Sequence, residues 1–350
     1  MAIPIRNLYF LLCYAWDSLE EVEQLHVGEE NSPDILDLLA RVLDSGLNHC
    51  IRRGFDRGYV PRTEVIRGLR GRIDFSASLK GIGFVRGELT CETDDFTVDV
   101  LHNQILKATL SRLLKSAICH ELKLRLHSHL ALLSGVSDVR LSPSLFGRVV
   151  LHRNNNFYRF LLDVCLLIYR NSIPDKQGAG YTFTDFTGDG AQMGKLFEAF
   201  VRNFIKRRPP FAAWQERIRW NWEAFDEMAY ALLPTMETDV CVTGGARKLV
   251  IECKFGLVTS SNAFGTERLR REHLFQLHAY LSNLPSSPEN SDCRGILLYP
   301  SSGIDFDVKY THLQRSIEVR TLNLDQKWED ISADVVNILE DRESQPVPSL

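Results

Sequence analysis

The chain has 350 residues, a formal net charge of −4 at pH 7 and 44% hydrophobic residues, which suits a globular protein of about two domains. The negative charge excludes a protein that coats DNA by bulk positive charge, so local basic residues or a partner must supply affinity for nucleic acid. The eight cysteines include no Cys-x-x-Cys pair, and the most apolar run, Phe160–Tyr169, is too short to cross a bilayer. We therefore expect a cytoplasmic protein with reduced thiols, no structural zinc and no membrane contact.

The first half of the chain predicts mostly helices. Apolar residues recur at helical spacing in five segments: 3–16, 32–50, 100–117, 121–133 and 156–171. Residues 59–75 and 81–98 differ, because β-branched residues and glycine turns there indicate a small β-rich unit. The pattern changes again near residues 150–175. We therefore expect a mixed α/β N-terminal domain of residues 1–155, which holds the β-rich unit, and a C-terminal domain of residues 156–350.

Four arginines gather in the β-rich unit with little acid close by in the sequence, namely Arg62, Arg67, Arg70 and Arg72. They could lie on solvated strand edges, where charge blocks the pairing of one edge with another. They could also form a contact surface for an acidic partner or for DNA. The residues alone favour the first interpretation slightly.

The second half predicts a β-hairpin after an amphipathic helix over 193–208 and a strand over 217–222. Strands over 238–242 and 248–255 flank the turn signal Gly244-Gly245. If the turn centres between Gly245 and Ala246, Asp239 lies opposite Glu252. Side chains two apart on a strand share a face, so Lys254 lies on the same face as Glu252.

Two carboxylates on adjoining strands repel each other and need a counter-charge, which either a divalent cation or the Lys254 ammonium can supply. Mg²⁺ prefers carboxylate oxygens, main-chain carbonyls and water, so Asp239, Glu252 and the carbonyl of Cys253 are candidate ligands. Lys254 would then lie beside a metal-bound water, as metal-assisted phosphodiester hydrolysis requires. The alternative is a surface hairpin with an ordinary Glu–Lys pair.

A helix over 273–284 follows the hairpin and places Gln276 and Tyr280 on one face, because they are four residues apart. Strands over 295–300 and 316–322 and a helix over 331–340 complete the chain. The resulting order is αβββαβ, that of a restriction-endonuclease core. Three arginines open the 273–284 helix and are candidates for contacts to DNA phosphates, against ordinary helix-surface charge: Arg268, Arg270 and Arg271.

The pattern Asp-x12-Glu-x-Lys on a hairpin, followed by Gln-x3-Tyr, resembles the RecB-like branch of the PD-(D/E)xK nuclease superfamily. One departure is that Thr238, not a proline, precedes Asp239. The resemblance implies that Asp239, Glu252 and the Cys253 carbonyl hold one or two Mg²⁺ ions and that Lys254 orients the attacking water. It implies that Gln276 and Tyr280 support the active site or the DNA strand. The superfamily often places an acid on the preceding helix, which makes Glu198 a further candidate ligand or else a solvated surface residue.

The chain as a whole resembles the McrC family, the nuclease subunits of methylcytosine-dependent McrBC restriction systems. The segments that carry this resemblance are Ile3-Pro-Ile-Arg-Asn-Leu-Tyr, Gly71-Arg-Ile-Asp-Phe, Asn171-Ser-Ile-Pro, Leu232-Leu-Pro-Thr-Met-Glu-Thr-Asp, Gly265-Thr-Glu and Leu297-Leu-Tyr-Pro.

The resemblance implies a partner, a McrB-type AAA+ GTPase hexamer that recognises DNA containing 5-methylcytosine. The N-terminal domain would insert into the hexamer's pore and stimulate GTP hydrolysis, with Arg62, Arg67, Arg70 and Arg72 at the contact. The partner would bind the GTP, because this chain has no Gly-x4-Gly-Lys-Ser/Thr phosphate loop. Two other interpretations remain open: an adaptor whose nuclease fold is inert, and a stand-alone RecB-like nuclease.

Overall fold

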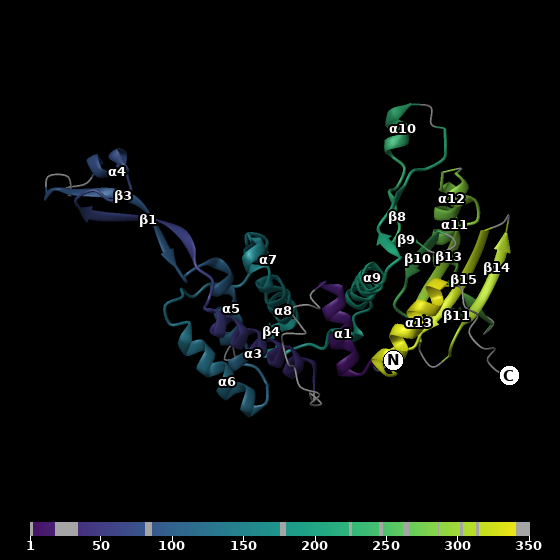
Figure 1. Ribbon diagram of the computed structural model, residues 1–350, viewed down its shortest axis with the longest axis horizontal. Coiled ribbons are helices and arrows are strands. Elements are labelled where there is room, and N and C mark those ends of the chain that lie inside the picture. Colours follow the sequence, from purple (N-terminus) through teal and green to yellow (C-terminus); the bar gives the residue numbers. More distant parts are fainter. Residues whose placement is uncertain are drawn as a thin grey trace. The chain divides into compact units, whose positions relative to one another are not determined.

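The structure, a computed structural model, describes residues 3–17, 34–80, 86–175, 180–223, 226–244, 248–261, 266–285, 287–301, 304–312 and 315–340. Predicted positions 32–33, 81–85, 245–247 and 262–265 lie outside these ranges. The chain forms two compact units (Figure 1). We call Met1–Leu19 with Phe186–Leu350 the sheet unit, and Glu20–Asp185 the helical unit.

The sheet unit is built on six strands in the spatial order β14-β15-β13-β10-β9-β6. Their bounds are Asp307–His312 (β14), Arg315–Leu322 (β15), Arg294–Pro300 (β13), Leu249–Cys253 (β10), Val240–Thr243 (β9) and Ala212–Trp214 (β6). β15, β13 and β10 are parallel, whereas the remaining pairings are antiparallel. Every residue of β10 and β13 is buried, which fits central strands covered on both faces.

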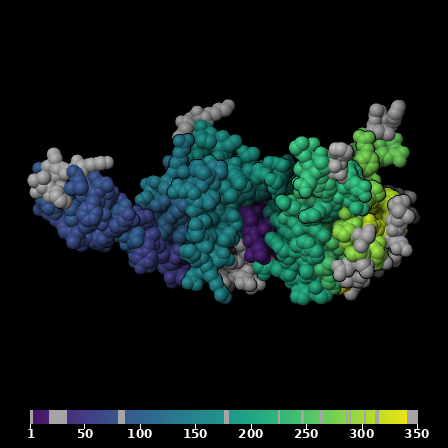
Figure 2. Space-filling view, turned by 90° about the horizontal axis from the view of Figure 1, so that it is seen from above, coloured from purple at the N-terminus to yellow at the C-terminus, as the bar shows by residue number. Residues whose placement is uncertain are grey.

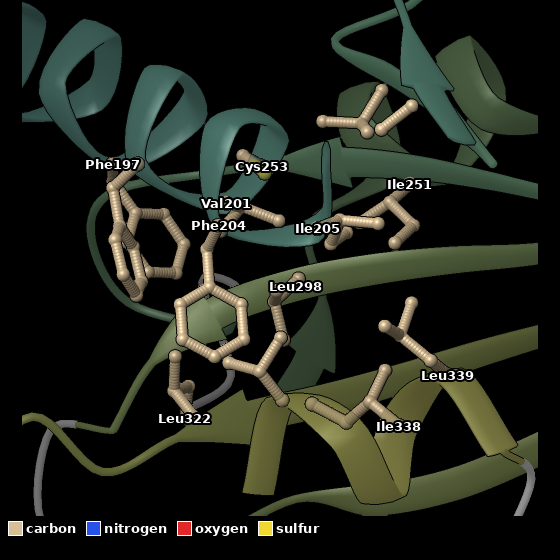
Figure 3. Packing of buried hydrophobic residues seen from close by; sticks show 14 of the residues in the cluster. Phe197, Val201, Phe204, Ile205, Ile251, Cys253, Leu298, Leu322, Ile338 and Leu339 are labelled. Carbon is tan, nitrogen blue, oxygen red and sulfur yellow. The ribbon is translucent and has the colours of Figure 1, made fainter. Parts of the chain in front are cut away.

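Helices cover both faces of this sheet. Helices α9 (Gly190–Lys206) and α13 (Trp328–Glu340) pack on one face, where Phe204 of α9, Ile251 of β10 and Ile338 of α13 belong to one apolar cluster (Figure 3). Helix α11 (Arg271–Asn283) packs on the other face through Leu277 and Leu281. The hairpin strands β9 and β10 are thereby fixed between two apolar layers.

The predicted αβββαβ core is present as α9, β6, β9, β10, α11 and β13 in chain order. The first strand differs from the prediction over 217–222. The strand that joins the sheet is β6, and only Arg217–Ile218 (β7) is extended in the predicted segment, where it pairs with Met236–Glu237 (β8). The alternation of Arg-Ile-Arg-Trp-Asn-Trp therefore marks a short outer ribbon, in which Trp220 and Trp222 pack on each other with ring centroids 4.5 Å apart.

Helix α1 (Ile5–Ala15) belongs to the sheet unit, which corrects its assignment to an N-terminal domain of residues 1–155. Tyr14 packs against Phe200 and Phe204 of α9, and the side chain of Asn203 donates to the Tyr14 and Ala15 carbonyls at 3.0 and 3.1 Å. In Figure 2 the purple surface of α1 adjoins the green surface of the sheet unit. Helical periodicity predicts that α1 is buried, but it cannot specify which unit buries it.

Asn7 is the polar anchor of α1, and its replacement with alanine is expected to destabilise the sheet unit. Its side-chain amide is 4% exposed and donates to the carbonyls of Leu324 and Gln326 at 2.8 and 2.7 Å. Alanine leaves both carbonyls without this donor, at a cost of about 1–3 kcal/mol. Urea unfolding followed by tryptophan fluorescence measures the change, with exposed Asn48→Ala as the control. Equal unfolding midpoints for wild type and Asn7→Ala would show that α1 does not stabilise this unit.

The helical unit consists of α3 (Ile35–Arg53), α5 (Leu101–Leu114), α6 (His120–Leu132) and α8 (Phe157–Asn171), which pack on one another. Helix α8 was expected in the C-terminal domain of residues 156–350, and that boundary is wrong. Its buried face, which includes Leu161 and Ile168, packs against α3 and α5, so the unit extends to Asp185.

The shorter elements complete the two units. In the helical unit they are α7 (Pro143–Gly147), η2 (Arg153–Asn155), β4 (Ser172–Pro174) and β5 (Tyr181–Phe183). In the sheet unit they are η3 (Phe186–Gly188), α10 (Glu227–Ala231), β11 (Thr259–Ser261), β12 (Glu267–Leu269) and α12 (Pro288–Ser291). Among the described residues, no helix combines the length and apolar character needed to cross a membrane.

Asp163 of α8 makes the stability of the helical unit depend on pH. Burial raises the pKa of its carboxyl from 3.8 to about 6, against a smaller lowering by Arg159. The folded state therefore holds this proton more tightly than the unfolded chain, and the carboxyl lowers stability progressively between pH 3.8 and about 6. Asp163→Asn should stabilise the unit by up to about 3 kcal/mol above that range and have little effect below it. Urea midpoints on both sides of the range test this, and an equal gain at both would contradict it.

A long β-sheet arm extends the helical unit. β1 (Gly58–Arg67) and β3 (Glu88–Thr97) pair antiparallel over ten residues each, with β2 (Arg72–Ile73) and the short helix α4 (Phe75–Lys80) beside them (Figure 1). Gly71 has a φ of +71°, and a Cβ there would lie 2.2 Å from the Glu92 carbonyl oxygen, so the turn requires glycine. The predicted β-rich unit is thus present as one arm.

The arginines of the arm have acidic partners, which corrects the expectation of little nearby acid. Ion pairs join Arg62 to Asp95, Arg67 to Glu88, Arg70 to Asp95 and Arg72 to Glu92, at 3.4–3.9 Å between charged atoms. These acids lie on β3, more than 15 residues from their partners in sequence. The antiparallel register places Arg67 opposite Glu88 and Arg72 opposite Glu92, whereas Arg62 is opposite Thr93 and reaches Asp95 two positions farther along β3. All four arginine side chains remain 47–86% exposed, so they stay accessible to a partner.

Candidate active site

The hairpin of β9 and β10 brings the predicted acids together in the predicted register. Ile251 pairs with Val240, so the next residue of β10, Glu252, lies across from Asp239, which directly precedes β9. The Asp239 N–H donates to Glu252 Oε1 at 3.2 Å, and the Cys253 N–H donates to Asp239 Oδ2 at 2.8 Å. The two carboxyl groups thus meet at the end of the hairpin farthest from its turn.

The environment of these carboxyl groups disfavours their charge. Glu252 is fully buried and Asp239 half-buried. Burial raises the pKa of Glu252 above its ordinary value, and the charge of Asp239 raises it further. Burial also raises the pKa of Asp239, with a smaller rise from the charge of Glu198. Because burial and mutual repulsion disfavour the ionised carboxylates, a bound cation would stabilise their charged forms.

Lys254 supplies part of the counter-charge. Its Nζ donates to Glu252 Oε2 at 3.0 Å, and its side chain is 18% exposed. Burial acts to lower the pKa of Lys254, but the charges of Glu252 and Asp239 outweigh it and hold the pKa above 10.5. Lys254 is therefore an ammonium that can donate hydrogen bonds to a water or a phosphate oxygen.

Glu198 lies on α9 beside this site but is already engaged. Its Oε1 accepts hydrogen bonds from Arg202 at 2.7 Å and from Gln215 at 3.0 Å. Arg202 also donates to the main-chain carbonyl of Asp239 at 3.1 Å. Sequence reasoning missed Arg202, although its position four residues after Glu198 on a helix is a usable signal. The pair ties α9 to the segment that presents Asp239.

Gln276 and Tyr280 share one face of α11, as predicted, and contact each other. Gln276 Nε2 donates to the Tyr280 hydroxyl at 2.9 Å, and that hydroxyl donates to the Glu237 carbonyl at 3.1 Å. Burial raises the pKa of Tyr280, and the charges of Glu252 and Asp239 raise it further, so the hydroxyl stays protonated beside the acids. Through Glu237, the pair holds the chain two residues before Asp239.

His273, on the same face of α11, is a residue that sequence reasoning missed. Its Nδ1 lies 2.7 Å from the hydroxyl of buried Tyr299, on β13. Cys253 pairs with Leu298 in the parallel register, so Tyr299 follows beside Lys254. Burial, and then the charge of Lys254, lower the pKa of His273. The spacing His-x2-Gln-x3-Tyr puts all three side chains on one helix face, and this pattern could have identified His273 from the sequence.

The three arginines proposed for DNA differ in their surroundings. Arg268 is exposed on β12 and lines a groove of about 730 Å³ that also contains Phe275 and Phe306. Arg270 donates to the Leu257 carbonyl at 2.9 Å and pairs with Glu272 at 3.3 Å, so part of its guanidinium is already engaged within the chain. Arg271 is exposed at the start of α11. Arg268 and Arg271 form no ion pair within the part of the chain that the structure describes.

The donor set suits a hard cation with oxygen ligands. No group of three or more His, Cys, Asp or Glu side chains among the described residues could hold a metal ion by itself. Asp239 and Glu252 offer two adjoining carboxylates whose pKa values are raised chiefly by burial, and Cys253 adds a main-chain carbonyl next to them. Two carboxylates completed by a carbonyl and waters is the coordination that Mg²⁺ favours.

The sequence and the fold match proteins of restriction systems. Residues 5–300 match the family model described as McrBC 5-methylcytosine restriction system component. The chain is 31% identical over 344 residues to the type IV methyl-directed restriction enzyme EcoKMcrBC of Escherichia coli K12, covering 97% of this chain and 98% of the relative. Its fold matches a chain in the half-complex of Thermococcus gammatolerans McrB AAA+ hexamers with bound McrC. That match has a TM-score of 0.56 at 17% identity and covers 96% and 76% of the two chains. The resemblance in the sequence is thereby confirmed, and the chain belongs to the family of McrBC 5-methylcytosine restriction system components.

Proposed function

We propose that this chain is the DNA-cutting subunit of a restriction complex that acts on DNA containing 5-methylcytosine and that it hydrolyses phosphodiester bonds with Mg²⁺. The observation that carries this proposal is that Asp239, Glu252 and Lys254 meet at one end of the hairpin. The Asp239 N–H donates to Glu252 at 3.2 Å, the Cys253 N–H donates to Asp239 at 2.8 Å, and Lys254 Nζ donates to Glu252 at 3.0 Å. The E. coli relative is named a methyl-directed restriction enzyme, which supports the substrate class.

In this proposal each residue has a distinct role. Asp239, Glu252 and the Cys253 carbonyl would hold Mg²⁺, and Glu198 would act as a further ligand through water. When bound, the cation would supply an activated water and would neutralise the negative charge that develops on the phosphate. Lys254 donates to the attacking water or to a phosphate oxygen and so orients the reaction. Gln276 and Tyr280 keep the Asp239 segment in place, and Arg268, Arg270 and Arg271 contact DNA phosphates.

The partner proposed for this chain is a McrB-type AAA+ GTPase hexamer, which would bind the GTP. The related solved structure contains McrB AAA+ hexamers with bound McrC, which supports that choice. The arm is the proposed contact, and Arg62, Arg67, Arg70 and Arg72 lie on it with large exposed fractions. Exposed apolar side chains accompany them, as interfaces require: Tyr59, Val65, Leu69, Phe75, Leu79 and Phe96, each at least 58% exposed.

The test is a pull-down of the hexameric GTPase followed by digestion of methylated and unmethylated plasmid. We expect the complex to cut only the methylated plasmid and to require both GTP and Mg²⁺. Cutting of both plasmids by the chain alone would indicate a stand-alone nuclease. Stimulated GTP hydrolysis without any cutting, in Mg²⁺ or Mn²⁺, would indicate an adaptor with an inert nuclease fold.

A further inference from the structure

The helical unit contains a basic pocket that none of the proposed roles uses. It has a volume of about 850 Å³ and is formed by the end of α5, residues 138–141, the end of α8, and the hairpin of β4 and β5. Its charged lining residues are Arg112, Lys115, Asp138, Arg140 and Arg170. The volume falls within the range of pockets that bind ligands.

The positive charge of this pocket is not compensated from within. Its one acid, Asp138, pairs at 3.0 Å with Lys107, which does not line the pocket. Lys115, Arg140 and Arg170 are exposed and form no ion pair within the described ranges of the chain. Four cations therefore face one cavity in a chain whose net charge is −4. Four positive side chains around one cavity create a local positive potential, which attracts an anion even though the chain as a whole is negative.

Basic residues near helix ends often serve only to cap carbonyl groups, but here those carbonyls have other donors. The Arg112 carbonyl accepts from the Lys115 N–H at 3.1 Å and from the Ser116 hydroxyl at 2.9 Å. The Lys115 carbonyl accepts from the Tyr181 N–H at 3.2 Å. At the end of α8 the Ser172 hydroxyl donates to the Ile168 carbonyl at 2.6 Å. The exposed cations are therefore not needed as caps.

The side chain of Arg112, which lines the pocket, is fixed by contacts with its neighbours. Its guanidinium lies over the rings of Tyr181 and Tyr169, 4.1 and 5.0 Å from their centroids, and donates to the Ser172 carbonyl at 3.2 Å. A planar guanidinium fixed in this way loses little freedom when it binds an anion and suits the oxygens of a phosphate. The guanidinium covers one face of each tyrosine ring, and that face is therefore not open to a stacking nucleobase.

We propose that this basic pocket binds phosphate groups of the DNA backbone, which gives the helical unit its own contact to DNA. The proposal rests on the proposed function, in that the chain acts on DNA. Phosphate chemistry is favoured by the four cations, and the backbone is favoured over a free nucleotide because Arg112 already takes the tyrosine faces that it covers. Lys115, Arg140 and Arg170 are exposed and come from three different segments, so they suit an extended chain of phosphates.

The test neutralises the three exposed cations of the pocket in the full-length chain as Lys115→Gln, Arg140→Gln and Arg170→Gln. Arg112 is left in place because it packs on two tyrosines. The matched control is Arg52→Gln, Arg148→Gln and Arg153→Gln, which removes three exposed arginines of the same unit outside the pocket and changes the net charge equally. Both are made in a Lys254→Ala background and measured in EDTA, so DNA cleavage does not interfere.

Fluorescence anisotropy with a labelled duplex, between about 50 and 200 mM salt, reports the affinity and its salt dependence. We expect the pocket variant to bind about tenfold more weakly than the control at the lower salt, with a slope of log Kd against log salt smaller by about 2–3, near 0.9 for each lost phosphate contact. Equal affinities and slopes for the two variants would overturn the proposal.

Two further titrations identify the source of the phosphate. GTP and inorganic phosphate are titrated into the wild-type chain, the pocket variant and the control. We expect no difference among the three proteins. A loss of GTP binding in the pocket variant, with DNA affinity unchanged, would overturn the assignment to DNA. These results do not depend on catalysis, so failure of the proposed nuclease chemistry would be recognised separately by cleavage assays with Lys254 intact.

Discussion

Lys254→Ala is expected to reduce DNA cleavage by the complex about 10²–10³-fold while folding and GTPase stimulation persist. In the structure, the Lys254 Nζ donates to Glu252 Oε2 at 3.0 Å. Its raised pKa keeps it charged across neutral pH, so alanine removes both a hydrogen-bond donor and a positive charge from the place where the phosphate would react. Single-turnover cleavage of methylated DNA, with circular dichroism for folding, measures the effect.

A second lysine at β10 provides the control for this experiment. Lys248 directly precedes the strand, is 9% exposed and pairs with Glu216 at 2.7 Å, so it resembles Lys254 in burial and charge pairing. It belongs to the opposite end of the strand from Asp239 and Glu252. Lys248→Ala should therefore lower stability without removing cleavage at a temperature where it stays folded. Cleavage at the wild-type rate by Lys254→Ala would refute the role proposed for Lys254.

The sequence predicts the hairpin register because both determinants are local. A glycine turn and two β-branched strands fix which residues face each other, and the pairing of Ile251 with Val240 agrees with the register expected from the turn. The αβββαβ order also follows from local periodicity, except that β6 is only three residues long and gives little alternation to detect. Short strands owe their existence to pairing rather than to their own residues.

The remaining features depend on contacts that a single sequence does not reveal. Helix α1 joins the sheet unit through Asn7 and residues more than 300 positions away. The contact between His273 and Tyr299 likewise requires the packing of α11 on β13. In the arm, Arg67 meets Glu88 through the register of β1 with β3, and Arg72 meets Glu92 through the register of β2 with β3. In each case the residue pattern is present, but its partner is chosen by tertiary structure.

Replacing Arg67, Arg70 and Arg72 of the arm with alanine is expected to reduce stimulation of the partner's GTP hydrolysis by at least about tenfold. The three side chains are 67–86% exposed, and their ion pairs with Glu88, Asp95 and Glu92 are 3.4–3.9 Å long on the surface. Surface pairs of this kind contribute little to folding, at most about 1 kcal/mol each, so the arm should persist. Their loss would remove positive charge from a surface that also exposes apolar side chains such as Leu69 and Phe75.

The measurement is the rate of GTP hydrolysis by the hexamer as the variant is titrated in. Arg52→Ala, Arg148→Ala and Arg153→Ala together form the control, because they remove equal charge from exposed positions off the arm. Stimulation that matches wild type in the arm variant would place the partner contact elsewhere. Comparison with Lys254→Ala separates the roles proposed for the two units. The Lys254→Ala variant should keep GTPase stimulation and lose cutting. The arm variant should lose stimulation, and under the proposal that cleavage requires the partner its cutting should fall too, even though Asp239, Glu252 and Lys254 are unchanged.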